Sequence, residues 1–379
     1  MLLYVTQLHT GDNMGSRLIS FAILAVTVLA LYAVPVGDLS ADGAITVEDG
    51  LGETFSFDGP VDCIVSIGVG VTATVIGIGA LDKVVVCDSY SKMNADPLFD
   101  PLRDLIDEGD VMAGGNLYSS GKEQLKVDII NVSDPVTGSF DRDSDVVFVT
   151  GSDAYRANVV PFLIENGFRN VMQWYEIGDY ADLEAFAETI SLVCNGNIHP
   201  DVESIGYTAE FISSTLMAAD VEPVHAFYVT YSAGVFKVGN TGSIANSMIG
   251  AAGGISVTTD DDRPQSTYET NLTVLVGEYP SAVVFADHSI VSDDGNLSLL
   301  RKAVGDGVTI VPLEAMWNNY SLESVEGVWT MACAMYPDLF EGDVPTAGGS
   351  GSDVVMYLGL SSVFVAVILL VSYMYMRKR

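Results

Sequence analysis

Positive charge is scarce in this sequence of 379 residues. Lys and Arg together number 16, whereas Asp and Glu number 50, and the formal net charge is −34. Clustered Lys and Arg are what bind nucleic-acid phosphates, so this composition excludes a nucleic-acid partner. A solvated acidic surface explains the excess more simply than a specific cation site, although a salty habitat or an attraction for cations would also fit.

Cysteine and histidine are also rare, with four residues of each. No cysteine pair has the spacing of a metal site. Cys63 and Cys87 fall at opposite ends of neighbouring predicted strands, beyond disulfide reach, and we expect free thiols. Among the histidines only His288 follows a predicted strand, and no Ser-His-Asp or paired-carboxylate arrangement is visible. The sequence therefore predicts no enzyme, no metal site and no cofactor.

Two long uncharged runs lie near the ends of the chain. Residues 1–37 have the form of a signal sequence or an N-terminal anchor. Residues 354–376 are long enough, as a transmembrane helix, to cross a bilayer of about 30 Å. A linker at 341–353 precedes this run, and Arg377, Lys378 and Arg379 follow it. Basic residues next to a membrane span remain in the cytoplasm. We expect a single C-terminal anchor in the cell membrane, with the acidic domain on the extracytoplasmic face.

Residues 61–91 are the centre of the sequence and read as strand, turn, helix, turn, strand. Gly68 and Gly70 interrupt the first apolar run, and Thr72 or Thr74 would cap the helix that follows. Together with Asp88, twenty residues on, the glycines fit the loose fingerprint of a dinucleotide-binding turn. Glycine-rich turns after strands are common, so a dinucleotide-dependent enzyme is only one reading of this unit.

A second reading comes from a longer match. The stretches Ile64-Val65-Ser66-Ile67, Ala73-Thr74, Gly79-Ala80, Asp82-Lys83-Val84-Val85 and Asp88-Ser89-Tyr90-Ser91 stand in the order and spacing of one known family. They resemble the opening of class III periplasmic substrate-binding proteins, which have a helical backbone between two lobes. These proteins serve ABC importers of iron-siderophores, haem and cobalamin. The resemblance continues over roughly residues 45–340.

The resemblance implies an α/β fold with two Rossmann-like lobes joined by a single long helix. It places an N-terminal lobe at 44–197, the interlobe helix at 198–221 and a C-terminal lobe at 222–340. The patterns predict a hairpin over 45–57, a helix over 200–220 and another over 267–277. They also predict buried strands over 145–149, 171–174, 225–229, 281–285 and 308–312.

The function that the resemblance implies is capture of a metal chelate for an ABC permease and its ATPase. Aromatic and hydroxyl side chains past the strand ends would face the crevice between the lobes, and aromatic faces suit a flat macrocycle or a chelate shell. Tyr90 and Trp317 match positions where relatives place ring-contacting aromatics. Arg156 and Arg263 are the basic candidates for an anionic siderophore. The expected ligand-binding residues are Tyr90, Ser91, Tyr118, Tyr155, Tyr231, Phe236, Arg263, His288 and Trp317.

One position departs from the family pattern. Relatives carry on each lobe a Glu that docks on permease arginines, and counting back from Pro280 gives Thr273 instead. Glu269 and Glu123 are the nearest acidic candidates on the C-lobe and the N-lobe. An adhesion or envelope protein that kept the fold and lost transport is therefore a rival interpretation.

Overall fold

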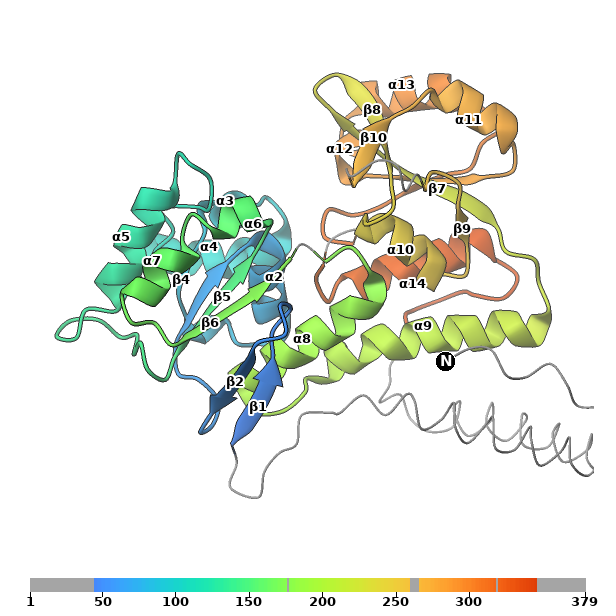
Figure 1. Cartoon of the computed structure of the whole chain (residues 1–379). Coiled ribbons are helices and arrows are strands. Elements are labelled where there is room, and N and C mark those ends of the chain that lie inside the picture. The colour runs from blue at the N-terminus through green and yellow to red at the C-terminus, as the bar shows by residue number, and fades with distance from the viewer. Residues whose placement is uncertain (1–43, 176, 260–265, 318–319, 346–379) are drawn as a thin grey trace, which may run out of the picture.

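The computed structural model describes residues 44–175, 177–259, 266–317 and 320–345. Two α/β lobes stand side by side, and the long helix α9 (Pro200–Ala219) starts beside α8 and runs beneath the lobe drawn on the right (Figure 1). The predicted signal segment, the transmembrane run at 354–376, Arg263 and most of the linker lie outside these residues. Within them, no helix is both long and apolar enough to cross a membrane.

The N-lobe, residues 44–197, is built on a four-stranded parallel sheet in the order β4-β3-β5-β6, preceded by the β1-β2 hairpin. Its strands are β1 (Ile45–Glu48), β2 (Thr54–Phe57), β3 (Ile64–Ile67), β4 (Val84–Cys87), β5 (Val146–Thr150) and β6 (Asn170–Trp174). Every residue of β3 and β5 is buried, as the unbroken apolar runs predicted. In β5, Phe148 packs toward one face of the sheet and Val147 toward the other.

Helices cover both faces of the N-lobe sheet. Residues of α2 and α8 belong to the cluster that contains Phe148, whereas residues of α5 and α7 belong to the cluster that contains Val147. The helices are α2 (Val69–Gly77), α3 (Ser89–Met93), α4 (Asp100–Glu108), α5 (Lys122–Val132), α6 (Asp153–Arg156), α7 (Val160–Glu165) and α8 (Tyr180–Asn195), with short 3-10 turns η1 (Leu81–Lys83) and η2 (Pro97–Phe99).

The C-lobe, residues 222–340, has a mixed sheet in the order β10-β8-β7-β11-β12, with β9 paired to β7. Its strands are β7 (His225–Ser232), β8 (Val235–Gly239), β9 (Ile255–Ser256), β10 (Thr267–Glu269), β11 (Val283–Ala286) and β12 (Ile310–Pro312). Strands β7, β11 and β12 are parallel, whereas β8 and β10 run antiparallel to their neighbours. The helices are α10 (Ile244–Ala251), α11 (Leu272–Glu278), α12 (His288–Val291), α13 (Asp294–Val304) and α14 (Ser324–Met335).

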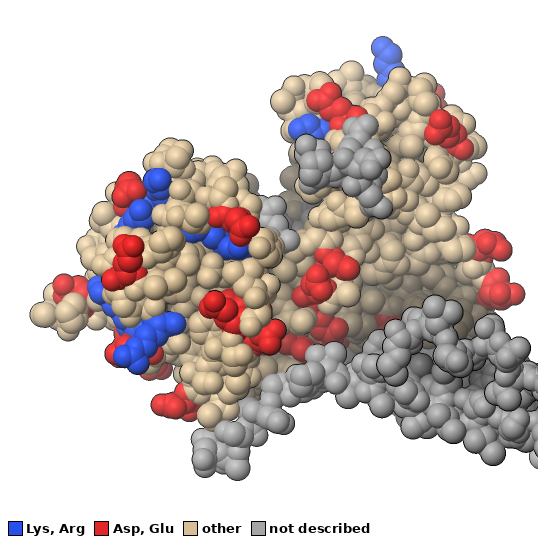
Figure 2. Space-filling model, in the orientation of Figure 1, with Lys and Arg blue, Asp and Glu red and all other residues tan. Residues whose placement is uncertain are grey.

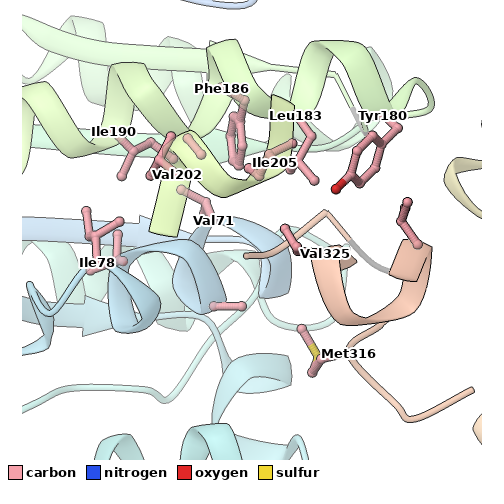
Figure 3. Close-up of a cluster of buried hydrophobic side chains, with 14 of the residues drawn as sticks. Val71, Ile78, Tyr180, Leu183, Phe186, Ile190, Val202, Ile205, Met316 and Val325 are labelled. Atoms are coloured by element: carbon pink, nitrogen blue, oxygen red, sulfur yellow. The ribbon is translucent and has the colours of Figure 1, made fainter. Parts of the chain in front are cut away.

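Helix α9 (Pro200–Ala219) has 20 residues and is therefore about 30 Å long. It is not the only link between the lobes, because one buried cluster includes Val71 of α2, Phe186 of α8, Ile205 of α9 and Val325 of α14 (Figure 3). The N-lobe and the C-lobe therefore share one hydrophobic core in addition to their separate ones.

Polar contacts add to this shared core. Ser247 of α10 donates through Oγ to the Asp179 carboxylate at 2.7 Å, and the same Oγ accepts a bond from the Tyr180 N–H at 2.8 Å. These bonds join the first turn of α8 in the N-lobe to α10 in the C-lobe. A hydrogen-bonded and packed interface of this kind restricts how far the lobes can move apart.

Two local predictions are wrong. The residues predicted as a helix over 267–277 instead form β10, followed by α11. Thr267 and Glu269 pair with Gly239 and Lys237 of β8, and this edge pairing overrides the helical pattern.

The start of α2 also differs from the prediction. Gly68 stands at the N-cap position, and neither Thr72 nor Thr74 caps the helix. Both threonines are buried inside α2, where their hydroxyls donate to the carbonyls of Gly68 and Gly70 four residues earlier.

Candidate functional site

A pocket of about 220 Å³ opens where the carboxyl ends of β3, β4 and β5 meet. Ligands bind at such strand ends in open α/β sheets. Residues of both lobes line the pocket, and Figure 2 shows a hollow between the two lobes. Its walls come from the turns after these three strands, from the loop at 116–118 and from one C-lobe side chain, Tyr320.

The glycine turn beneath the pocket is explained by packing. Gly68 has φ +124°, and a Cβ on it would lie 1.9 Å from Thr150 Oγ1. A Cβ on Gly70 would lie 2.0 Å from Cε2 of Tyr320. The first glycine therefore lets β3 turn against β5, and the second lets a C-lobe ring reach α2.

Asp88 is bonded within its own chain. One carboxylate oxygen accepts from the Gly68 N–H at 2.8 Å and from Ser91 Oγ at 2.8 Å. The other accepts from the N–H groups of Tyr90 at 2.8 Å and Ser91 at 3.2 Å. The dinucleotide reading would need this carboxylate for a ribose hydroxyl and the glycine turn for a pyrophosphate. Here the carboxylate and the turn bind each other, which counts against that reading.

Three of the expected ligand-binding residues come together at the pocket. The ring of Tyr118 lies edge-on to both of its neighbours, with centroid distances of 5.1 Å to Tyr90 and 4.4 Å to Tyr155. All three line the pocket and remain partly exposed: Tyr90 is 44% exposed, Tyr118 39% and Tyr155 37%. Aromatic rings of this size are normally buried, so three exposed together indicate a binding surface.

Ser91, another expected ligand-binding residue, is fully buried. Its hydroxyl donates to Asp88 and to Thr72 Oγ1, so Ser91 holds the turn beneath the pocket.

The sequence reasoning missed Tyr320. This residue follows β12 in the C-lobe, packs over Gly70 and lies 6.2 Å from the Phe186 ring, centroid to centroid. It is the one C-lobe residue among the described residues that line the pocket. No local signal separates Tyr320 from other loop tyrosines, because its role depends on a contact between the lobes.

The remaining C-lobe candidates lie elsewhere. Tyr231 and Phe236 face each other across the β7-β8 hairpin, with ring centroids 4.9 Å apart, and pack against the C-lobe core. Trp317 is partly buried and lies against Gly327 of α14. His288 begins α12 with its side chain 46% exposed, and its Nδ1 lies 3.8 Å from the Glu314 carboxylate. Within the described chain, none of these four lines the pocket.

Arg156 does not face a ligand, which corrects the expectation from the sequence. It is 3% exposed, and its Nη1 donates to the carbonyl oxygens of Gly151 and Trp174, each at 2.8 Å. Its Nη2 donates to Asp153 at 2.6 Å. The guanidinium therefore joins the ends of β5 and β6 behind the pocket wall.

The candidate docking acids are both exposed and lie on different lobes. Glu123 is in the first turn of α5 and pairs with Lys126 at 3.2 Å. Glu269 is on β10, opposite Lys237 of β8. Thr273, at the position where relatives have the acid, donates its hydroxyl to the Ala303 carbonyl at 2.8 Å.

No group of three or more potential ligands that could hold a metal is found within the residues that the structure describes. The four cysteines are free, as expected. Burial raises the pKa of the Cys87 and Cys194 thiols well above the ordinary value, so both remain protonated and unreactive at neutral pH.

The contact between α8 and α9 gathers acidic side chains. Burial raises the pKa of Glu184, and the nearby carboxylates of Glu188, Glu203 and Glu210 raise it further. Burial and the charge of Glu203 likewise raise the pKa of Glu188. These like charges oppose the packing of the two helices at neutral pH.

The fold has clear counterparts among solved structures. The vitamin B12 binding protein BtuF of Vibrio cholerae aligns with a TM-score of 0.53 and 14% identity over 73% of this chain and 97% of that one. The heme-binding protein RhuT from Roseiflexus sp. RS-1 aligns with a TM-score of 0.52 and 14% identity over 73% and 98%. The TroA-like FepB from Veillonella parvula aligns with a TM-score of 0.54 and 13% identity over 78% and 91%.

At the level of sequence, no protein-family model matches the chain, and no curated protein matches it. The structural likeness, at identities of 13 to 14%, shows the fold. The chain has the fold of class III periplasmic binding proteins, as the motif of residues 64–91 predicted.

Proposed function

We propose that this chain is a membrane-anchored extracytoplasmic substrate-binding protein that captures a metal chelate for an ABC importer. The chelate classes are a ferric siderophore, haem or cobalamin. The observation that carries the proposal is the group of exposed tyrosines, Tyr90, Tyr118 and Tyr155, with Tyr320 opposite them, around a pocket in the interlobe cleft. Nothing in the fold of this pocket calls for an enzyme, and the similar structures named above are binding proteins.

The architecture suits capture without large movement. The shared core and the bonds between Asp179, Tyr180 and Ser247 hold the lobes together. A pocket that exists before binding loses little entropy when the ligand enters. A chelate larger than 220 Å³ would rest on the tyrosines and extend beyond the pocket.

Anchoring is part of the proposal and rests on sequence. The uncharged run at 354–376 and the three basic residues after it favour a C-terminal anchor, with the domain outside the cell. Protease added to intact cells should release the domain by cutting near residues 347–352. Complete protection of this segment in cells with an intact envelope would reverse the proposed topology.

Docking to a permease is proposed to use Glu123 and Glu269, which are exposed on separate lobes. The double variant Glu123→Ala/Glu269→Ala should stimulate the cognate transporter less than wild type, with ligand affinity unchanged. Equal stimulation by the double variant would place the docking acids elsewhere. The second candidate, an envelope protein without transport, is favoured by Thr273, whose hydroxyl serves α11 packing at the expected docking position.

The test of ligand capture is a fluorescence titration of the purified full chain with cobalamin, haemin and ferric siderophores. These ligands absorb light and quench tryptophan emission on binding. We expect saturable quenching by at least one of them, weakened about tenfold or more in Tyr118→Leu, since a stacked ring contributes about 1.5–3 kcal/mol. If none of them quenches, chelate capture is wrong and the envelope-protein candidate gains support.

A further inference from the structure

The charge of the ligand can be inferred from the charges around the tyrosine pocket. Among the described residues that line it there is no Lys, Arg or His, and Asp88 is its one charged side chain. Anionic chelates are normally held by Arg or Lys forks. A pocket lined in this way offers a negatively charged ligand no countercharge.

The position that would attract an anion is already occupied. Helix α2 begins at the pocket floor, and the N-terminus of a helix favours negative charge. Asp88 lies at this end and accepts the Gly68 N–H, so its carboxylate is the anion of the turn. A second negative charge placed above it would meet repulsion from Asp88.

Two basic side chains that follow pocket-wall elements along the chain have other partners. Arg156 gives its Nη1 and Nη2 bonds to Gly151, Trp174 and Asp153 behind the wall. Lys122 donates to the Asn158 side chain at 3.4 Å, beneath the loop that carries Tyr118. Neither ammonium nor guanidinium lines the pocket.

The rings themselves favour the opposite charge. The face of a tyrosine ring carries negative electrostatic potential, and several rings around one cavity form a site for cationic groups. Tyr90, Tyr118, Tyr155 and Tyr320 surround a volume of about 220 Å³, which is smaller than the usual ligand pocket of about 300–1,000 Å³. The space therefore suits one arm or edge of a chelate.

We propose that the tyrosine pocket selects ligands that present an electroneutral or cationic group and rejects those that present an anionic one. This inference rests on the proposed function for the identity of the ligand as a metal chelate. It narrows the ligand class to neutral or cationic chelates, such as hydroxamate complexes bearing an amine. Catecholate complexes with several negative charges are disfavoured.

The test uses three ligands that differ only in the charge of one arm. These are a linear ferric trihydroxamate with a pendant primary amine, its N-acetyl derivative and its N-succinyl derivative, titrated into the full chain at constant ionic strength. We expect the amine and acetyl forms to bind at least about tenfold more tightly than the succinyl form. In Tyr118→Leu the ratio of the amine-form affinity to the succinyl-form affinity should fall toward one.

A matched control separates the pocket from the acidic surface. Tyr207→Leu, on α9 and away from the pocket, has the same net charge as Tyr118→Leu and should keep the wild-type ratio. If Tyr118→Leu keeps the wild-type ratio, as Tyr207→Leu should, the discrimination comes from the overall charge of the chain and the inference is overturned.

The remaining outcomes show whether charge selection fails, the proposed function fails, or both fail. Equal binding of the three forms, or tightest binding of the succinyl form, overturns charge selection and leaves chelate capture standing. If none binds, calorimetry with tetramethylammonium and with acetate decides. Binding of tetramethylammonium alone, lost in Tyr118→Leu, supports the cation-selective pocket and counts against capture of a hydroxamate chelate, whereas binding of neither overturns the cation-selective pocket.

Discussion

The two lobes differ in their sheets and in the turns that follow the strands. The N-lobe has four parallel strands, and the turns after three of them converge on one pocket. The C-lobe has the parallel strands β7, β9, β11 and β12 but adds the antiparallel strands β8 and β10. Its aromatic pair, Tyr231 and Phe236, is packed across that hairpin and stabilises it.

This difference shows that carboxyl ends of parallel strands form a site only where the turns after them leave space. In the N-lobe, glycines at 68, 70 and 151 keep the turns small, and rings fill the rim. In the C-lobe, Asp287 after β11 accepts bonds from the Tyr228 hydroxyl at 2.7 Å and the Ser289 N–H at 2.9 Å. Among the described residues, the C-lobe contributes to the pocket through one loop residue, Tyr320.

The first prediction asks whether the two lobes unfold together or separately. A substitution at Phe186, in the core that the lobes share, tests this. Its ring is 2% exposed and lies between Trp174 of the N-lobe and Tyr320 of the C-lobe. We expect Phe186→Ala to lower the free energy of unfolding by about 3–5 kcal/mol in a single urea transition. Phe162→Ala, at the edge of the separate N-lobe core, should cost less. Two transitions in Phe186→Ala would show independent lobes.

Gly70 tests how closely the C-lobe approaches the N-lobe. Gly70→Ala should destabilise the chain by about 1–3 kcal/mol and weaken ligand binding, because the new methyl group would overlap the Tyr320 ring. Gly250→Ala in α10 is the control. It meets no atom within 4 Å and should stabilise the chain by up to about 1 kcal/mol. Urea melts of both variants give the difference, and equal stabilities would mean that Tyr320 gives way without cost.

The stability of the chain should depend on pH through the contact between α8 and α9. The raised pKa of Glu184 means that the folded chain binds its proton more tightly than the unfolded chain does. This contribution to stability is complete below the unfolded-state pKa of about 4.3 and is lost as the pH rises toward the folded-state value. Glu184→Gln should therefore stabilise the chain at pH 7 by about 1 kcal/mol or less, with little effect at pH 4. Glu165→Gln, exposed on α7, is the control, and the same gain in both would assign the effect to net charge alone.

The smallest effect is expected for the C-lobe pair itself. Tyr231→Leu should change ligand affinity by less than about twofold, because Tyr231 packs against Phe236 and the C-lobe core. Calorimetric titration beside Tyr118→Leu gives the comparison. A tenfold loss in Tyr231→Leu would extend the binding surface to the β7-β8 hairpin and make the two lobes more alike than the pocket indicates.

Much of the fold could be predicted from the sequence, because it depends on local patterns. The interlobe helix was predicted over 200–220 and spans Pro200–Ala219, and the strand predicted before the glycine turn is β3. These elements have long periodic or unbroken apolar patterns. β10 was missed because its three residues are strand only through their pairing with β8.

Some of the residues that line the pocket could be found from the sequence, for the same physical reason. Tyr90, Tyr118 and Tyr155 stand after strand ends or in the loop beside them, which a pattern can show. The role of Tyr320 arises from a contact with Gly70, some 250 residues earlier, which no local pattern contains. The position of Arg156 was misjudged because backbone carbonyls, which every residue has, are its partners.

The bonding of the pocket floor has a consequence for the orientation of a bound molecule. The side chains of Asp88, Asn116 and Thr150 all have partners within the chain. Polar groups turned downward would lose their water without gaining these partners, at a cost in free energy. A bound molecule would therefore hold an apolar or cationic edge against the rings and turn its other hydrogen-bonding groups toward the open side. Under the proposed function, those outward groups would remain visible to a receiving protein before the ligand is released.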